Sequence, residues 1–272
     1  SGFGPTGPYR DRSAYDTVMQ AYAGLATNQA DPDDGVPTFL RQTAADKVTA
    51  LYASQAITAA LFARAQGCGG QHLELSMTDA VVSFLWADAA ANEVLMESDG
   101  SQNSSFVAGF RPMRFADGWG IVTPTSDHDF AGMCRAVGAK GYDDPRIATV
   151  AERIKNRDVL SPVMDMVYAL AANLTMEEAT ERFEAERVPF AMILSPEQLT
   201  RDPHAVAMGL FVEADHPVVG RTRLPRHPAQ FEVTPATITG GSPALGEHTD
   251  EILSELGMGD RIAALRSEGI VA

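Results

Sequence analysis

One alanine-rich segment, between a polar loop and a group of glycines, constrains the fold of this chain most. Its larger apolar residues recur at helical intervals, at Val48, Leu51, Tyr52, Ile57 and Leu61. Thr43 and Asp46 precede them with the spacing of a capping box, and Gly67 with the glycines after it can end a helix. The pattern therefore predicts a helix over residues 44–65, with Asp46 in its first turn. Its many alanines would let a sheet or another helix pack closely against it.

Other segments near this helix also have recognisable patterns. We expect a short helix over residues 15–25, a strand over 71–75 and a second apolar helix that starts after Ser76 and runs to about residue 96. Ser76 and Asp79 repeat the capping-box spacing. The polar, small residues that follow predict a linker at 98–110.

The rest of the chain mixes strands and helices. A hairpin is expected over residues 113–122, turning at Asp117-Gly118, and a strand over 190–194. Helices are expected at 128–138, at 143–172 with a break inside that range, and at 175–187, which together predict a small α+β module. Two strands around Gly220 and two closing helices at 247–256 and 260–268 follow.

Composition excludes several classes of function. The chain has 21 Lys and Arg against 36 Asp and Glu, a formal charge of -15, so a nucleic-acid partner is not expected. An anionic ligand is still allowed, because a few local arginines are enough to bind phosphates; the candidates are Arg10, Arg12, Arg111 and Arg114. No apolar stretch is long enough to cross a membrane, and the two cysteines have no metal-type spacing. We therefore expect a soluble, cytoplasmic protein.

Short motifs for other chemistries are weak. Gly2, Gly4 and Gly7 fit the dinucleotide fingerprint by spacing, but Pro5 and Pro8 oppose the helix that this site requires. The six histidines lack the i, i+4 pairing of a helical zinc site, so no metal is expected. Neither a nucleophile elbow nor a P-loop occurs.

An ordered set of motifs resembles the class III (CaiB/BaiF-type) CoA-transferase family. The motifs near the start are Ser-Gly-Phe-Gly at 1–4, Gly7-Pro8-Tyr9, Tyr15-Asp16 with Gln20-Ala21, Asp46, Arg64 with the glycines and Gln71, and Ser76-Met77-Thr78-Asp79-Ala80. Near the end, Arg201-Asp202-Pro203-His204 and Gly246-Glu247-His248-Thr249-Asp250 resemble the closing part of the same family. The resemblance spans nearly the whole chain.

The resemblance implies an α/β fold: a Rossmann-like large domain with an inserted small α+β domain, in an interlocked homodimer. The chain lacks the leading βα units of that large domain, so we expect it to be N-terminally incomplete. The implied domains are 1–97 for the first visible part of the large domain, 98–110 for the linker, 111–200 for the small domain and 201–272 for the return to the large domain. The leading part could be supplied by a separate N-terminal chain.

Asp46 matches the position of the family nucleophile. A carboxylate in the first turn of a helix is held as the anion by the helix dipole and by free backbone N–H groups. Spacing alone favours a plain capping-box acid at Asp46, whereas the family resemblance favours the nucleophile. It implies an acyl-CoA:carboxylate CoA-transferase that works through an aspartyl anhydride and an aspartyl-CoA thioester, with coenzyme A entering as the acyl-CoA substrate and a free carboxylic acid as its partner.

Tyr15, Asp16 and Ser13 match family positions that line the substrate and CoA site. Oxalate-handling members carry a lysine at Ser13, which disfavours oxalate or formate here, and they carry a run of glycines that residues 100–109 lack. Two alternatives stay open. One is a 2-methylacyl-CoA racemase, whose members have His at Tyr15; a tyrosine with an ordinary pKa near 10 is a poor base at neutral pH. The other is a non-catalytic subunit of a CoA-transferase complex.

Overall fold

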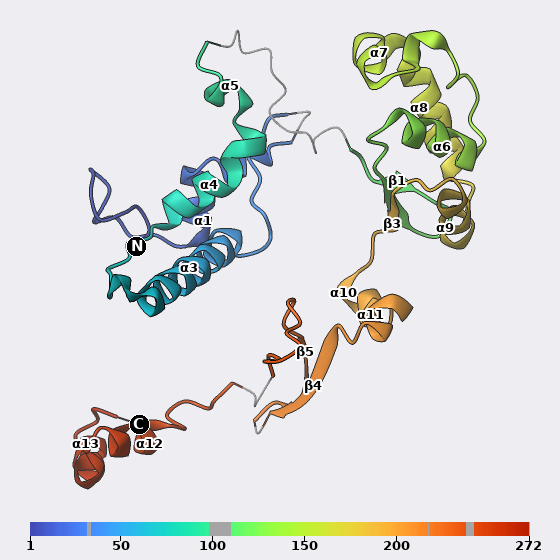
Figure 1. Ribbon diagram of the computed structural model, residues 1–272. Helices are drawn as coiled ribbons and strands as arrows, with labels where there is room; N and C mark the ends of the chain where they lie inside the picture. The colour runs from blue at the N-terminus through green and yellow to red at the C-terminus, as the bar shows by residue number, and fades with distance from the viewer. Residues whose placement is uncertain (32–33, 98–109, 217, 238–241, 272) are drawn as a thin grey trace. The chain divides into compact units, whose positions relative to one another are not determined.

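The computed structural model describes residues 1–31, 34–97, 110–216, 218–237 and 242–271 (Figure 1). They form two compact units, Ser1–Pro112 and Met113–Ala272. Helices and small antiparallel sheets together give a mixed α/β architecture. Most of the expected linker, including the glycine-poor stretch 100–109, lies outside the described residues, so the four-part domain division stays a prediction.

Unit 1, which is Ser1–Pro112, is built from helices in the part that the structure describes. They are α1 (Asp16–Tyr22), α2 (Leu25–Asn28), α3 (Ala44–Ala63), the π-helical turn η1 (Arg64–Cys68), α4 (Met77–Ala89) and α5 (Ala91–Val94). Helix α1 packs against both α3 and α4, and α3 packs along α4. The small core between them is formed by Met19, Leu25, Ala45 and Val81.

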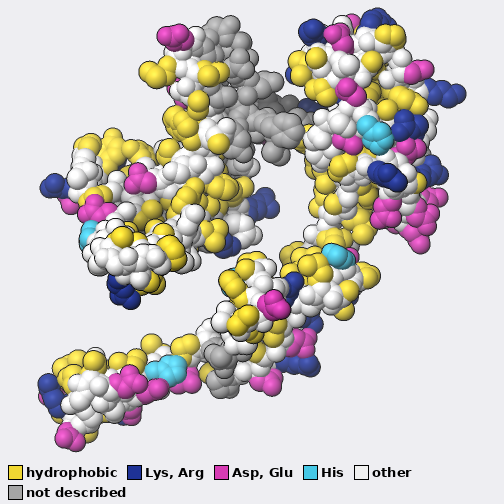
Figure 2. Space-filling view, in the orientation of Figure 1, with side chains coloured by type: hydrophobic (Ala, Val, Ile, Leu, Met, Phe, Trp, Pro, Cys, Tyr) yellow, Lys and Arg dark blue, Asp and Glu magenta, His cyan; other side chains and the backbone are white. Residues whose placement is uncertain are grey.

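Helix α3 is the alanine-rich helix expected from the sequence, and it ends where the glycines begin. Gly67 has a positive φ of 92°, a backbone conformation that glycine adopts without steric cost. The outer face of α3 is not covered by unit 1: Leu51, Ile57 and Phe62 are 73%, 52% and 67% exposed. Apolar side chains are accordingly frequent on the visible surface of this unit (Figure 2).

Two expectations for unit 1 were wrong. Residues 71–75 form no strand; instead Leu75 O accepts a hydrogen bond from the amino group of Ser1 at 3.1 Å, and Met77 N–H donates to Ser1 O at 2.9 Å. A strand needs a partner, and among the described residues only this short pairing is available. The second apolar helix also stops at Ala89, and α5 follows as a separate short helix.

Unit 2, Met113–Ala272, begins with a three-stranded antiparallel sheet. Strands β1 (Met113–Arg114) and β2 (Trp119–Val122) form the predicted hairpin, and β3 (Phe190–Met192) pairs with the other edge of β2. The helical elements between β2 and β3 are α6 (Asp127–Val137), η3 (Pro145–Ile147), α7 (Val150–Lys155), α8 (Arg157–Ala171) and α9 (Met176–Ala185). The break expected within residues 143–172 is present, since this segment forms three separate elements, η3, α7 and α8.

An aromatic cluster fills the core of this part of unit 2. Phe115 and Phe183 are fully buried, and Phe190 stacks on Phe183 with ring centroids 4.8 Å apart. Gly120 lies against the same rings: a Cβ there would be 2.7 Å from the Phe190 ring and 3.0 Å from the Phe115 ring. Any larger residue at position 120 would therefore force the sheet and the aromatic cluster apart.

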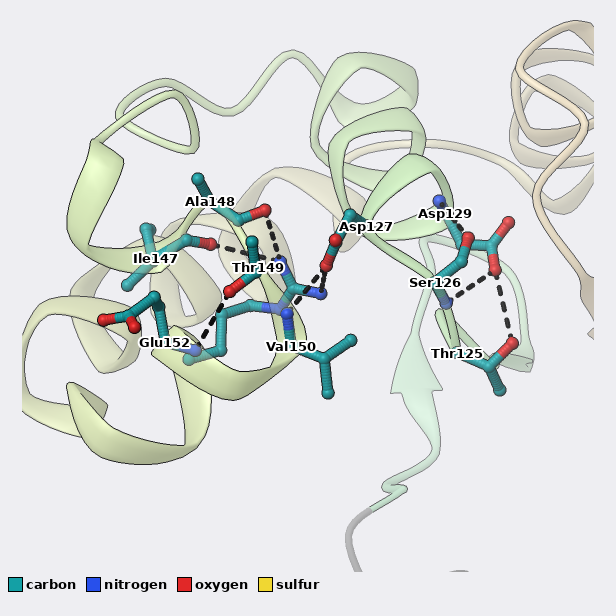
Figure 3. A network of polar contacts seen from close by, with 10 residues as sticks. Thr125, Ser126, Asp127, Asp129, Ile147, Ala148, Thr149, Val150 and Glu152 are labelled. Carbon is teal, nitrogen blue, oxygen red and sulfur yellow. Dashed lines mark hydrogen bonds and ion pairs between the residues drawn. The ribbon is translucent and has the colours of Figure 1, made fainter.

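A network of polar contacts joins α6 to the η3–α7 segment, and Figure 3 shows Asp127 lying across from Ile147, Ala148 and Val150 in it. Arg153 donates to Asp127 Oδ1 at 2.7 Å and to the carbonyl oxygen of Ile147 at 3.1 Å. Its guanidinium also lies over the ring of Phe130, 4.4 Å from the centroid. Asp127 in turn accepts the backbone N–H of Val150 at 2.7 Å. The charge of Arg153 is thus compensated inside the unit, which indicates a structural role.

Hydrogen bonds stabilise the start of α9 in two ways, within the helix and to the β1–β2 hairpin. Thr175 and Glu178 form a complete capping box. Met176 N–H donates to Asp117 Oδ1 in the hairpin turn at 2.8 Å, and Ala116 N–H donates to Leu174 O at 2.8 Å. Residues nearly sixty positions apart in sequence therefore share one set of hydrogen bonds.

The remaining elements of unit 2 follow β3. They are α10 (Pro196–Leu199), α11 (Pro203–Ala207), the antiparallel hairpin β4 (Phe211–His216) and β5 (Gly220–Pro225), α12 (Thr249–Glu255), η4 (Gly259–Arg261) and α13 (Ile262–Ser267). All strand pairs in the described ranges are antiparallel, so the Rossmann-like sheet stays a prediction. Within those same ranges, no helix has both the length and the hydropathy needed to cross a membrane.

Candidate active site at the start of helix α3

Asp46 is the third residue of α3, and its side chain is exposed. Its carboxylate forms no hydrogen bond or ion pair with any residue that the structure describes. The expected capping box is wrong here, because Thr43 makes no side-chain bond to the helix start. Thr43 has ψ 67°, whereas the threonine that caps α9 has ψ 163°, the extended conformation from which a side chain reaches the first-turn N–H groups. The Asp46 carboxylate is thus exposed and not used in capping, so a substrate could reach it.

Asp16, which belongs to helix α1, caps the start of α3. It is the first residue of α1 and is only 7% exposed, and its Oδ2 accepts the backbone N–H of Asp46 at 3.1 Å. A buried carboxylate is costly unless hydrogen bonds satisfy it, and the positive end of the α3 dipole favours it at this place. Asp16 therefore contacts the backbone of Asp46 across thirty residues of sequence.

Gln20 completes this buried network. Its amide nitrogen donates to Asp16 Oδ1 at 2.5 Å and to Gln42 O at 3.0 Å, and its amide oxygen accepts the N–H of Leu40 at 3.0 Å. Leu40 and Gln42 belong to the loop that leads into α3. In the sequence, Gln20 stands out only as part of the Gln20-Ala21 motif. The i, i+4 spacing of Asp16 and Gln20, which places both on one helix face, is the signal that could have revealed the pair.

Tyr15 and Ser13 lie just before α1. Tyr15 is the N-terminal flanking residue of that helix and is 80% exposed, and Ser13 is exposed as well. Tyr15 directly precedes Asp16, whose carboxylate accepts the backbone N–H of Asp46. The roles of Tyr15 and Ser13 toward a substrate stay predictions.

A shallow hollow lies on the outer face of α1. It is lined by Phe3, Arg12, Thr17, Val18, Ala21, Tyr22 and Phe39. The rings of Phe3, Tyr9 and Tyr22 contact one another edge to face, with centroids 5.0 to 5.9 Å apart, and the guanidinium of Arg12 lies 3.7 Å from the centroid of Tyr9. Asp46, Tyr15 and Ser13 are not among the lining residues. An apolar hollow with a cation at its rim can hold a flat ring or an acyl chain that carries an anionic group.

Two of the other arginines considered for phosphate binding have partners of their own. Arg10 pairs with Asp11 at 3.2 Å, and Arg114 in unit 2 lies over the ring of Trp119. In the described ranges, no three His, Cys, Asp or Glu side chains are grouped as metal ligands would be. Cys68 is exposed, whereas burial raises the pKa of the Cys134 thiol to about 12.

Comparison with known proteins agrees with the motifs. Residues 1–249 match the sequence profile of CoA-transferase family III. The chain is 29% identical to a succinate–glutarate CoA-transferase of Agrobacterium fabrum over 97% of its own length and 66% of the relative's. It is 28% identical to the human succinyl-CoA:glutarate CoA-transferase, covering 100% of this chain and 62% of that protein.

A solved structure gives the same result for the fold. The crystal structure of a CaiB/BaiF family protein from Brucella suis superposes with a TM-score of 0.75 at 26% identity, covering 94% of this chain and 66% of the other. The chain thus spans somewhat less than two thirds of the length of these relatives. Because the profile match covers most of the sequence, this chain belongs to CoA-transferase family III.

Proposed function

We propose that the protein is an acyl-CoA:carboxylate CoA-transferase whose nucleophile is Asp46. The observation that carries the proposal is that the Asp46 side chain is exposed in the first turn of α3 and takes no part in capping the helix. Asp16 accepts the backbone N–H of Asp46 instead. An acid used for capping would be unavailable for chemistry. Family membership supplies the substrate class, because relatives carry the names of CoA-transferases.

The proposed reaction begins when a carboxylate oxygen of Asp46 attacks the carbonyl carbon of an acyl-CoA. The C–S bond breaks, CoA leaves as the thiolate and a mixed anhydride forms. The thiolate then attacks the aspartyl carbonyl, which releases the first carboxylic acid and gives an aspartyl-CoA thioester. An acceptor carboxylate attacks this thioester and expels the thiolate again. Attack of the thiolate on the new acyl group forms the product acyl-CoA and restores the Asp46 carboxylate, with no net change in protons.

Several side chains near α1 are suited to substrate binding. We assign Tyr15 and Ser13 to the acyl and CoA portion because both are exposed and come directly before α1, the helix that carries Asp16. Arg12 and the aromatic residues of the hollow are candidates for an anionic and apolar part of the substrate. For Asp16, which the family resemblance assigns to the substrate and CoA site, we add a role in supporting Asp46, because one of its oxygens accepts the backbone N–H of that residue.

The finer architectural expectations are part of the same proposal. They are a Rossmann-like large domain, an inserted small domain at 111–200, a return to the large domain at 201–272, an interlocked homodimer or a separate N-terminal chain, and a cytoplasmic location. The exposed apolar residues on α3, Leu51, Ile57 and Phe62, support packing of this helix against further protein. Size measurement of the native protein by light scattering would test for the dimer and for a second chain.

Exchange of CoA between succinyl-CoA and a panel of free carboxylic acids, followed by mass spectrometry of the CoA esters, tests the activity. The intact protein is expected to form new CoA esters, and Asp46→Ala to form none. Glu178→Gln is the matched control, because Glu178 is the third residue of α9 but already closes a capping box. Its activity should equal that of the unmodified protein.

Hydroxylamine tests the covalent intermediate. We expect inactivation only after an acyl-CoA is added, with a hydroxamate on Asp46 in the peptide map. Equal inactivation without acyl-CoA would argue against an aspartyl species. Loss of α-deuterium from a chiral 2-methylacyl-CoA without any acyl exchange would identify a racemase instead. Neither reaction, together with co-purification of an active paralogue, would indicate the non-catalytic subunit.

A further inference from the structure

Gln20 is a polar side chain that the proposed reaction does not use, yet it is completely buried. Its exposed fraction is 0%, the lowest among the buried polar residues that the structure describes. A buried amide without partners destabilises a protein, so such a residue is found where its hydrogen bonds are specific. An apolar side chain of similar size would fill the same space without needing any partner.

The hydrogen bonds of Gln20 go to Asp16 and to the loop that leads into α3. One side of its amide binds Asp16 Oδ1 at 2.5 Å, and the other Asp16 oxygen binds the backbone N–H of Asp46 at 3.1 Å. The amide nitrogen also donates to Gln42 O and approaches Leu40 O at 3.4 Å, and the amide oxygen accepts the N–H of Leu40. One side chain therefore fixes both the carboxylate that caps α3 and the loop that enters α3.

We propose that Gln20 is a positioning residue for the nucleophile. It orients the Asp16 carboxylate so that one oxygen faces the N–H of Asp46, which sets the direction in which the first turn of α3 presents the Asp46 side chain. This inference depends on the proposed function, since it assigns Gln20 to the step in which Asp46 attacks the thioester. Gln20 is fully buried, so its loss should change the rate of that step and leave substrate binding intact.

The single variants are Gln20→Met, which removes the hydrogen bonds at similar volume, and Gln20→Glu, which places a second carboxylate against Asp16. We expect kcat to fall about 10- to 100-fold in both, with KM within about 2-fold of the unmodified protein, because a small displacement of a reacting group costs rate more than affinity. Thermal unfolding of each variant shows that the comparison is made on folded protein.

The decisive variant combines Gln20→Glu with Asp16→Asn. This exchange lets the amide introduced at position 16 donate to the carboxylate introduced at position 20, while its oxygen still accepts the N–H of Asp46. The carbonyls of Leu40 and Gln42 remain without their donor. If Gln20 acts by orienting position 16, kcat should recover at least about 5-fold relative to Gln20→Glu alone. A role limited to supporting the loop predicts no recovery.

Hydrogen exchange gives a readout that does not depend on activity. In the intact protein the amide of Asp46 should be protected, and Gln20→Met should increase its exchange about 10-fold or more, while amides in the middle of α3 keep their protection. Unchanged protection of Asp46, or unchanged kcat in folded Gln20 variants of an active protein, would overturn the positioning role. Failure of the proposed function is seen separately, as absence of CoA exchange in the unmodified protein with the hydrogen-exchange result intact.

Discussion

Helices α3 and α9 begin with the same sequence pattern and use it in opposite ways. Each has a threonine before its first residue and an acid three positions later: Thr43 and Asp46 in α3, Thr175 and Glu178 in α9. In α9 the two side chains bond to each other's backbone, Glu178 N–H to Thr175 Oγ1 at 3.2 Å and Thr175 N–H to a Glu178 oxygen at 2.8 Å. In α3 neither bond forms.

The difference lies in where the capping group comes from. Asp16, on a separate helix, supplies the acceptor for the N–H of Asp46, so the acid of α3 itself has no structural task. The same four-residue pattern can thus produce a structural cap or an available carboxylate, depending on a distant residue. An acid in the first turn of a helix is therefore a candidate nucleophile when another residue, such as Asp16 here, accepts the backbone N–H that the acid itself would otherwise cap.

Replacing the first-turn acid by its amide should give the largest difference between the two helices, and this difference should be seen in the CoA-transfer rate. Asp46→Asn is expected to lower the CoA-transfer rate by at least about 10³-fold, because an amide is not a nucleophile for a thioester, while the urea midpoint changes little. Glu178→Gln should leave the rate unchanged. Steady-state kinetics and urea unfolding of both proteins measure this. An active Asp46→Asn protein would mean that the two acids do not differ in the proposed way.

Removal of the distant cap should convert α3 into a helix with an unsatisfied start. Asp16→Ala is expected to lower the free energy of unfolding by about 1–2 kcal/mol, since it removes a cap and leaves a buried amide of Gln20 with one partner fewer. Urea denaturation measures this loss. Asp11→Ala, a change at a highly exposed acid on the surface, serves as the control and should be nearly neutral. Equal stability of both variants would show that α3 does not depend on Asp16.

The self-contained cap of α9 can be tested by its own substitution. Thr175→Ala should destabilise the protein by about 1 kcal/mol, whereas Thr43→Ala should have almost no effect because Thr43 forms no cap bond. Thermal unfolding of the two single variants gives the comparison. If Thr43→Ala were as damaging as Thr175→Ala, the two helix starts would be equivalent after all.

The same cap predicts a pH dependence. Hydrogen bonds from the backbone N–H and then the side chain of Thr175 lower the pKa of Glu178 from its ordinary value of 4.5. A lowered folded-state pKa means that this stabilisation is present above pH 4.5 and is lost as the pH falls through the folded value. The difference in urea midpoint between the unmodified protein and Glu178→Gln should therefore shrink on acidification. A constant difference would contradict the cap.

The smallest expected effect concerns the cysteines, one in each unit. Only Cys68 should react with a thiol reagent in the native protein, because Cys134 is fully buried and its raised pKa, about 12, keeps the thiol protonated. Both should react in urea. Mass spectrometry after labelling reads the result. Native labelling of Cys134 would show that the core of unit 2 opens more readily than its packing suggests.

Features that depend on neighbours in sequence were predictable, and those that depend on distant partners were not. The hairpin turn at Asp117-Gly118 and the end of α3 at the glycines were correctly predicted, because turn and cap preferences are local. The strand at 71–75 failed because a strand exists only with a partner. The exposed position of Asp46 could not be inferred either, since its cause is Asp16, thirty residues earlier.

The hydrogen bonds between the hairpin turn and the start of α9 have a consequence for how this protein opens. Asp117 accepts a hydrogen bond from the N–H of Met176, and Leu174 O accepts one from the N–H of Ala116. Fraying of either the hairpin turn or the start of α9 would therefore break hydrogen bonds of the other. They should lose their structure in one cooperative event, as a single folding unit assembled from two remote stretches of chain. Chain folding must therefore close that long loop before either end gains its full protection.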